Sequence, residues 1–331
     1  GGSGDNTLSY GGVMQGVTLS VNQTTGTSTG ADSGKVDFSH ISHFIGGAGN
    51  DAFAVAKGDA TAYDFQGGDG NDTFTLGNGA VSVDGGAGKN TIQYTNTEQA
   101  VTVIVNQASG SITGADAGMV AFKNVTAFVG GAGLDQFKFA AGDITAYSVD
   151  GGQGSDTLDF TAAGTALSLQ LNGSGTSTVS GATANTYGTS TFSNIETIKT
   201  AGLGDTFAYS ATNTNNYTID ASAGSGVNKL DYSNSTSASA LTVLLAGSGA
   251  GTVSDAGSGY GVTTFSGVRS FATGAGNDTF DFSLEDKSNY AIDAAAGTAD
   301  ALNYASAGTA LTFTLNAAGT NSIATSITPG A

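Results

Sequence analysis

The sequence predicts an all-β protein, a right-handed parallel β-solenoid (a β-roll or β-helix) wound in turns of about 20–23 residues. Two observations predict it: a glycine-rich corner recurs along the chain, and short segments of alternating hydrophobicity return at equivalent places. The 331 residues include 53 Gly but 1 Pro, and no helical period persists through them. A unit this short cannot bury its own apolar face, so stacked neighbours must supply the core.

The corner has the pattern G-G-x-G-x-D-x-(large apolar)-x and is first complete in GGAGNDAFAV, residues 46–55. Glycine allows tight turns and close backbone approach, and the apolar residue begins the next strand. Intervals of 18–23 residues between successive acid or amide positions predict one turn, and intervals of 45–50 predict two. These positions are Asn6, Asp51, Asp72, Asn90, Asp135, Asp156, Asp205, Asn228, Asp278 and Asp300.

Five alternating segments predict half-buried strands, at residues 17–21, 101–105, 167–171, 241–245 and 311–315. Four are followed by an asparagine, which we expect to stack in an internal amide ladder: Asn22, Asn106, Asn172 and Asn316. The small-residue segments that begin at Thr27, Ser111, Ser177 and Gly251 are expected to be turns. Apolar triplets such as Phe38, Ile41 and Phe44 are expected to fill the core, together with recurring Phe and Tyr residues.

The repeats predict one elongated domain over residues 1–331, with units at 1–84, 85–150, 151–220, 221–294 and an incomplete unit at 295–331. A β-sandwich of repeated domains is the rival fold, but its hairpins would not need the same glycine–acid corner in every turn. Residue 1 is not Met and the first ten residues already match the repeat. We therefore expect a processed product or a part of something longer.

The chain is acidic, with 27 Asp and Glu against 9 Lys and Arg and a net charge of −18. Such a surface repels nucleic acid, so we expect no nucleic-acid partner. No apolar run approaches the roughly 18–20 residues of a membrane span. The chain has no Cys, 2 His and no recognisable Ser-His-Asp arrangement, so we expect no enzymatic activity. His40 and His43 are interpreted as solvent positions, not metal ligands.

Paired acidic corners suggest a cation site. Calcium takes 6–8 oxygen ligands from carboxylates and carbonyls, which two stacked corners can supply and one cannot. The intact pairs are Asp51 with Asp72 and Asp135 with Asp156, and Asp72 with Asn90 is a third. Acids just before a corner can add ligands: Asp84, Asp150 and Asp220. The alternative is a turn without metal, which we favour at Asp205, Asp278 and Asp300.

These corners resemble the nonapeptide repeat of RTX (haemolysin-type calcium-binding) proteins, whose parallel β-rolls bind calcium between turns. The resemblance implies that calcium is held by Gly46, Gly47, Gly49, Asp51, Gly67, Gly68, Gly70, Asp72, Gly130, Gly131, Gly133, Asp135, Gly151, Gly152, Gly154 and Asp156, with Asn90 and Asp278 as less complete matches. The family carries its motif in tandem every nine residues, whereas here it occurs about once per turn.

The resemblance implies an extracellular calcium-binding structural or adhesive repeat protein of a bacterial surface or secreted assembly. Its partners would be calcium, cell-surface or matrix components and other copies of itself. Two alternatives stay open. One is a self-assembling filament or S-layer subunit that stacks end to end, since open solenoid ends are unpaired sheet edges. The other is a non-catalytic module of a secreted enzyme that acts on polysaccharides or lipids.

Overall fold

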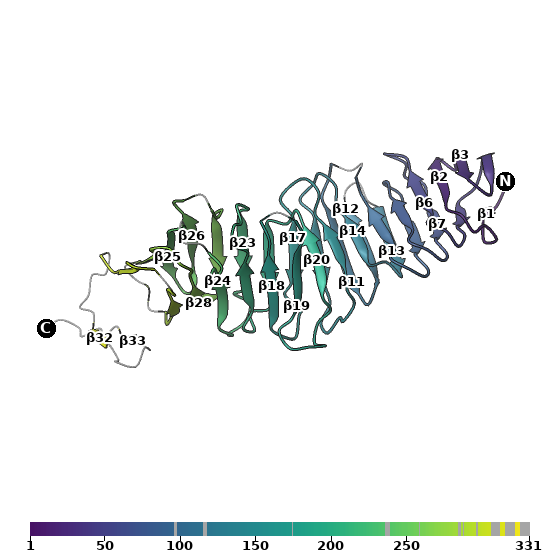
Figure 1. Ribbon diagram of the computed structural model, residues 1–331. Coiled ribbons are helices and arrows are strands. Elements are labelled where there is room, and N and C mark those ends of the chain that lie inside the picture. The colour runs from purple at the N-terminus through teal and green to yellow at the C-terminus, as the bar shows by residue number, and fades with distance from the viewer. Residues whose placement is uncertain are drawn as a thin grey trace.

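The chain forms an elongated rod of two long β-sheets, with the N-terminus at one end (Figure 1). This computed structural model describes residues 1–95, 98–114, 118–173, 175–235, 239–257, 259–283, 286, 288–295, 297–305, 312–314 and 322–324. Every regular element in these residues is a strand. The predicted all-β solenoid is confirmed.

The first sheet has 16 strands. In chain order they are β1 (Thr7–Ser9), β5 (His43–Ile45), β7 (Tyr63–Gln66), β9 (Val81–Asp84), β11 (Val101–Asn106), β12 (Ser109–Gly114), β13 (Gly118–Lys123), β15 (Gln136–Phe139), β17 (Thr157–Phe160), β21 (Thr197–Thr200), β23 (Tyr217–Asp220), β25 (Leu241–Gly247), β26 (Ala250–Asp255), β27 (Thr263–Ser266), β29 (Thr279–Phe282) and β31 (Ala301–Asn303).

The second sheet has 15 strands. They are β2 (Val17–Asn22), β3 (Thr25–Gly30), β4 (Gly34–Phe38), β6 (Ala52–Val55), β8 (Thr73–Thr75), β10 (Thr91–Gln93), β14 (Ala127–Val129), β16 (Ser148–Asp150), β18 (Leu167–Leu171), β19 (Ser177–Gly181), β20 (Ser190–Ser193), β22 (Thr206–Tyr209), β24 (Asn228–Asp231), β28 (Val268–Ala272) and β30 (Ala291–Asp293). Strands β32 (Thr312–Thr314) and β33 (Ser322–Ala324) pair separately.

The chain crosses between the sheets at every half turn, and the strands of successive turns pair in parallel. Strand β6 pairs with β8 so that Phe53 lies opposite Phe74, 21 residues later. This register confirms that the short interval is one turn. It also excludes the β-sandwich, because these stacked strands are parallel and not joined by hairpins.

The parallel stack is interrupted by four antiparallel insertions that the sequence analysis did not predict. They are β2–β3–β4, β11–β12–β13, β18–β19–β20 and β25–β26–β27, and they alternate between the sheets. The segments expected as small-residue turns are their central strands, so that expectation is wrong. These central strands are rich in Thr, Ser and Gly, and they gain strand partners on both sides.

The insertions also explain the long intervals, which are not two plain turns as expected. Asp51 and Asp72 lie where the chain passes from the first sheet to the second, before β6 and β8. Asp135 and Asp156 lie where it passes from the second sheet to the first, before β15 and β17. Each insertion therefore moves the acidic corner to the opposite edge of the rod.

A buried carboxylate and a phenol anchor the first two insertions. Residues 107 and 108, in the β11–β12 turn, are Gln and Ala with φ of 50° and 59°, a conformation that favours Asn-Gly. The Gln107 N–H donates to Oδ2 of Asp143 (2.8 Å), and the Ala108 N–H donates to the Tyr147 hydroxyl (2.8 Å). That hydroxyl donates to the same Oδ2 at 2.7 Å. We call this arrangement the Asp–Tyr clamp.

The Asp–Tyr clamp recurs in the first insertion. Asp59 accepts from Gln23 (2.8 Å) and from the Tyr63 hydroxyl (2.6 Å), which accepts from Thr24 (3.0 Å). Asp59 and Asp143 are 3% and 1% exposed, and the hydrogen bonds of each outweigh burial and lower its carboxyl pKa. The clamps therefore hold two strained turns with ionised carboxylates.

The core is a set of aromatic columns along the rod axis, as the recurring Phe and Tyr residues predict. Phe53 stacks on Phe74 with ring centroids 5.0 Å apart, and Phe139 stacks on Phe160 at 4.8 Å. The predicted internal amide ladder is wrong: Asn22 and Asn106 are exposed at the ends of β2 and β11, and Asn172 is half-buried in the turn after β18. Asn316 lies outside the described residues.

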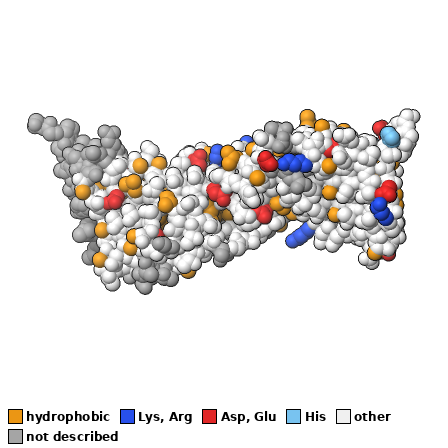
Figure 2. All heavy atoms as spheres, turned by 90° about the horizontal axis from the view of Figure 1, so that it is seen from above, with side chains coloured by type: hydrophobic (Ala, Val, Ile, Leu, Met, Phe, Trp, Pro, Cys, Tyr) orange, Lys and Arg blue, Asp and Glu red, His pale blue; other side chains and the backbone are white. Residues whose placement is uncertain are grey.

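The face of the rod seen in Figure 2 carries charged and hydrophobic side chains scattered among uncharged polar ones. In the described part of the chain, no helix has the length and apolar character that crossing a membrane requires.

Candidate metal centre

The acids of the corners point inward and form a hydrogen-bond ladder between turns, here called the inner ladder. Asp51 donates its backbone N–H to Oδ1 of Asp72 (2.8 Å), and Asp72 donates its own to Oδ1 of Asn90 (2.9 Å). At the opposite edge, Asp135 donates to Oδ1 of Asp156 at 2.7 Å. All five side chains are at most 2% exposed. Each acid therefore satisfies the backbone of the preceding turn.

Every inner ladder begins at the first strand of an insertion. The first N–H groups of β2, β11, β18 and β25 donate to the next corner acid at 2.7–2.9 Å. These donors are Val17, Val101, Leu167 and Leu241, and the acceptors are Asp51, Asp135, Asp205 and Asp278. Sequence reasoning missed the donors because apolar residues contribute here only through their backbone.

An outer ladder runs in the opposite direction and explains the Asn before some corner acids. Oδ1 of Asn50 accepts from the backbone of Asn71 (2.7 Å), and Oδ1 of Asn71 accepts from Lys89 (2.7 Å). Both asparagines are exposed. In each Asn-Asp pair, the Asp side chain therefore accepts a backbone hydrogen bond from the preceding turn, and the Asn side chain accepts one from the following turn.

The corner glycines let successive turns lie in close contact. A Cβ on Gly70 would lie 2.3 Å from the carbonyl oxygen of Gly49, and one on Gly154 would lie 1.9 Å from that of Gly133. The second glycine of a corner also supplies a carbonyl to the next turn: Asp69 donates to Gly47 (3.0 Å) and Gln153 donates to Gly131 (2.9 Å). These carbonyl oxygens are therefore already used as acceptors for backbone hydrogen bonds between turns.

The second carboxylate oxygen separates the corners into two kinds. Oδ2 of Asp51 accepts the Gly47 N–H (2.7 Å), and Oδ2 of Asp135 accepts the Gly131 N–H (2.8 Å). Oδ2 is buried without a hydrogen-bond partner in the described structure at Asp72 and Asp156. The backbone explains Asp156: Gly152 has a φ of +93° and donates its N–H to Asp150 instead, at 3.2 Å.

Carboxylate and carbonyl oxygens meet where the first glycine lacks a side chain. A Cβ on Gly46 would lie 2.1 Å from Oδ2 of Asp51 and 2.2 Å from the oxygen of Gly67. A Cβ on Gly67 would lie 2.1 Å from Oδ2 of Asp72 and 2.6 Å from the oxygen of Gly85. The result is a buried column of alternating carboxylate and carbonyl oxygens.

The second pair repeats this oxygen column. A Cβ on Gly130 would lie 2.2 Å from both Oδ2 of Asp135 and the oxygen of Gly151. A Cβ on Gly151 would lie 2.5 Å from Oδ2 of Asp156 and 2.0 Å from the oxygen of Asn194. The structure therefore brings together the acids of both predicted pairs.

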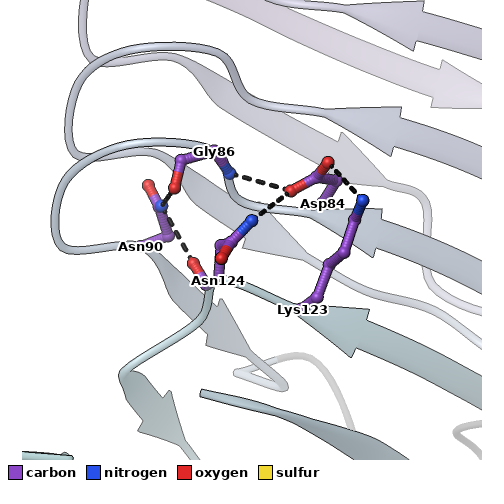
Figure 3. Close-up of polar contacts among 5 residues, drawn as sticks. All are labelled: Asp84, Gly86, Asn90, Lys123 and Asn124. Atoms are coloured by element: carbon purple, nitrogen blue, oxygen red, sulfur yellow. Dashed lines mark hydrogen bonds and ion pairs between the residues drawn. The ribbon is translucent and has the colours of Figure 1, made fainter. Parts of the chain in front are cut away.

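The asparagine corners show what an ordinary rung of the ladder contains. In Figure 3, the Asn90 amide donates to the carbonyl oxygens of Asn124 (3.0 Å) and Gly86 (3.4 Å). Asn228 donates to Gly267 in the same way, at 2.8 Å. At Asp72 and Asp156, a carboxylate oxygen stands where Asn90 has its amide nitrogen, and it lies beside a carbonyl oxygen. Two acceptors side by side repel each other unless a proton or a cation lies between them.

Burial and like charge act together on these carboxyls. Burial raises the pKa of Asp72 to about 6, with Asp51 and Asp69 adding repulsion against one backbone hydrogen bond. Burial raises the pKa of Asp156 to about 7, and the nearby carboxylates Asp135, Glu196 and Asp150 raise it further. Asp135 and Asp278 also have raised pKa values, mainly because of burial.

The three acids expected to add ligands are used differently. Asp84 accepts from Gly86 and Asn124 and pairs with Lys123 at 2.9 Å (Figure 3). Asp150 accepts from Asn194 at 2.6 Å, and Asp220 accepts from the Ser222 and Ser266 side chains. These carboxylates join neighbouring turns by hydrogen bonds and lie outside the oxygen column.

The oxygen column fits a hard cation in its chemistry. Calcium prefers carboxylate and carbonyl oxygens, and both kinds lie close together beside each first glycine, where a Cβ would clash with them. Asp51, Gly67, Asp72 and Gly85 would hold an ion at one edge, and Asp135, Gly151, Asp156 and Asn194 at the other. No three His, Cys, Asp or Glu side chains converge as metal ligands in the described residues, so carbonyls would have to supply much of the shell.

The histidines agree with a solvent interpretation. His40 is exposed, and the half-buried His43 ring lies 3.3 Å from Oδ2 of Asp64. Comparison of the chain with models of known protein families and with curated protein sequences finds no match.

Proposed function

We propose that this chain is an extracellular structural or adhesive rod of a bacterial surface or secreted assembly, and that it binds calcium at its paired corners. The resemblance of the corners to RTX repeats supports both parts. The continuous two-sheet stack supports a rod, because length grows with each added turn while the cross-section stays constant.

One observation carries the calcium proposal: the unpartnered Oδ2 of Asp72 faces the carbonyl of Gly85, where the next turn places an amide donor. Buried polar groups normally have a partner. A divalent cation between two stacked corners would supply one and offset the repulsion between Asp51 and Asp72. Ion binding to the folded state alone would couple stability to calcium, by about 2.7 kcal/mol at a hundred times the dissociation constant.

The test compares wild type with Asp72→Asn and Asp156→Asn after EDTA treatment. Thermal unfolding is followed by far-UV circular dichroism as calcium is added. Without calcium we expect each variant to unfold at a higher temperature than wild type, because the new amide can donate as Asn90 does. With calcium we expect wild type to gain stability, and each variant to gain less.

Asp37→Asn is the matched control, since it removes one negative charge at an exposed position of β4. It should leave the response to calcium unchanged. A wild type whose unfolding temperature does not depend on calcium between micromolar and millimolar concentration would remove the calcium part of the proposal. The structural rod would remain.

A further inference from the structure

The third insertion, β18–β19–β20, lacks the Asp–Tyr clamp. Asn213 stands where the first two insertions have Asp59 and Asp143. Its amide donates to the carbonyl of Leu171 (3.1 Å), and its Oδ1 accepts from the backbone of Asn215 (3.2 Å). Strand β18 ends at Leu171 and β19 begins at Ser177, whereas only residues 23 and 24 separate β2 from β3. The longer connection has no carboxylate anchor at the Asn213 position.

An open cavity of about 220 Å³, which we call the third-insertion cavity, lies beside this connection. It is lined by Asn172 and Gly175 together with residues of the β20–β21 and β22–β23 connections. Phe192 and Ile195 are buried apolar members of its lining. Its polar lining includes Asn172, Glu196, Asn215 and Asn216.

Each of these four polar side chains has one terminal atom held and one free. Glu196 accepts the Asp156 N–H with Oε2 (2.8 Å), and Asn216 accepts the Val262 N–H with Oδ1 (2.8 Å). Asn172 donates its amide to the Thr176 carbonyl at 2.7 Å, and Asn215 donates its amide to the Tyr217 hydroxyl at 3.4 Å.

The free atoms are Oε1 of Glu196, Nδ2 of Asn216 and Oδ1 of Asn172 and Asn215. None of them makes a hydrogen bond to another described residue. Side chains already fixed at one atom lose little rotamer freedom when a ligand binds, so the cavity is preorganised.

We propose that the third-insertion cavity binds the ring of a neutral saccharide. Three free acceptors and one free donor match hydroxyl groups, which both donate and accept. No Lys or Arg is among the described residues that line the cavity, which disfavours an anion. The lining is mainly polar, as a ligand rich in hydroxyl groups requires, and the volume is below the about 300–1,000 Å³ of drug-sized ligands. One sugar ring fits this description.

This inference deepens the adhesive role proposed above and rests on it for its biological meaning. The cavity adjoins the second corner pair, because Asn194 and Glu196 line it and Glu196 accepts the Asp156 N–H. Sugar binding is therefore tested without calcium. A cavity that binds sugar in the presence of EDTA would stand even if the calcium proposal failed.

The experiment is ligand-observed saturation-transfer NMR on the full chain in EDTA. The probes are glucose, galactose, mannose and N-acetylglucosamine. We expect saturation transfer to at least one of them with wild type. Asn215→Ala should weaken its binding about fivefold, the loss of one ordinary hydrogen bond. Thr145→Ala, the equivalent position beside the Asp–Tyr clamp of the second insertion, should leave binding unchanged.

Glu196→Gln is the second variant, since glutamine keeps an oxygen for the Asp156 N–H. It should weaken binding while the circular dichroism spectrum stays that of wild type. Absence of transfer to all four sugars overturns the proposal. So does equal weakening by Asn215→Ala and Thr145→Ala. Displacement of a bound sugar by calcium, with loss of that displacement in Glu196→Gln, would identify a cation site instead.

Discussion

The backbone N–H of Asp51 donates a 2.8 Å hydrogen bond to Oδ1 of Asp72. The acid of one turn thus supplies the hydrogen-bond acceptor for a backbone N–H of the preceding turn. Asp72 depends in the same way on Asn90. A corner side chain is therefore shared between turns, and a substitution that removes its Oδ1 acceptor should destabilise the neighbouring turn.

Stability should depend on pH through Asp72 and Asp156. Their folded-state pKa values, about 6 and about 7, exceed the usual 3.8. The folded chain therefore holds these protons more tightly than the unfolded chain. Their contribution is complete below about pH 4 and is lost as pH rises through 6 and 7. In EDTA we expect the free energy of unfolding to fall by a few kcal/mol between pH 5 and pH 8.

Urea unfolding at several pH values measures this dependence. The double variant Asp72→Asn/Asp156→Asn should flatten the fall above pH 5. An equally steep fall in that variant would show that other groups cause it. Below pH 4 we expect stability to decrease again, because Asp59, Asp84 and Asp143 have lowered pKa values and their contribution is lost on protonation.

The Asp–Tyr clamp should be a major contributor to stability. Asp143→Ala leaves the Gln107 N–H and the Tyr147 hydroxyl without their carboxylate, so we expect a loss of about 3 kcal/mol. Asp159→Ala is the control, because Asp159 caps only its own turn at Thr161, and should cost under about 1 kcal/mol. Urea unfolding compares the two, and similar losses would contradict the clamp.

Changing the clamped turn to Asn-Gly should reduce that loss. The variant Gln107→Asn/Ala108→Gly suits the left-handed conformation of both residues. In this background Asp143→Ala should cost about 1 kcal/mol less than in wild type. Strictly additive effects would show that the carboxylate does not support the turn.

The first glycine of the corner should not tolerate a side chain. In Gly67→Ala the new Cβ would lie 2.1 Å from Oδ2 of Asp72 and 2.6 Å from the Gly85 oxygen, so we expect a loss of at least about 2 kcal/mol. Gly164 has nothing within 4 Å of such a Cβ, and Gly164→Ala should be nearly neutral. Thermal unfolding of the two variants tests this difference in stability. Equal unfolding temperatures would show that the corner can expand to accept a side chain.

The inner ladder should matter more than the outer one. Asn90→Ala removes a buried acceptor and two donated hydrogen bonds, so we expect a loss of about 2–4 kcal/mol. Asn71→Ala removes an exposed acceptor, which water can replace, and should cost under about 1 kcal/mol. Urea unfolding ranks them, and the reverse order would contradict the burial argument.

Much of the architecture was predictable because it is periodic. The spacing of Asp51 and Asp72 gives the length of a turn, and the Phe two residues after each of these two acids gives one core column. Parallel stacking follows, because equivalent residues of successive turns then lie opposite one another. The candidate site was predictable to the same extent, since its acids lie one turn apart.

The insertions were not predictable from this pattern. Residues 25–30 are small and polar, and local preference alone suggests a turn there. They form β3 because β2 and β4 lie on either side and offer backbone partners, and because Asp59 and Tyr63, more than 30 residues away, hold the β2–β3 turn.

By itself, the sequence determined the all-β solenoid, the turn length and the residues of the inward corners, because these depend on spacing along one chain. The tertiary structure alone decided which edge each corner occupies and which carboxylate oxygen stays unpaired. Those features depend on where distant backbone N–H groups point. The N–H of Gly47 points at its corner acid and that of Gly152 does not, although both glycines hold the same place in the motif.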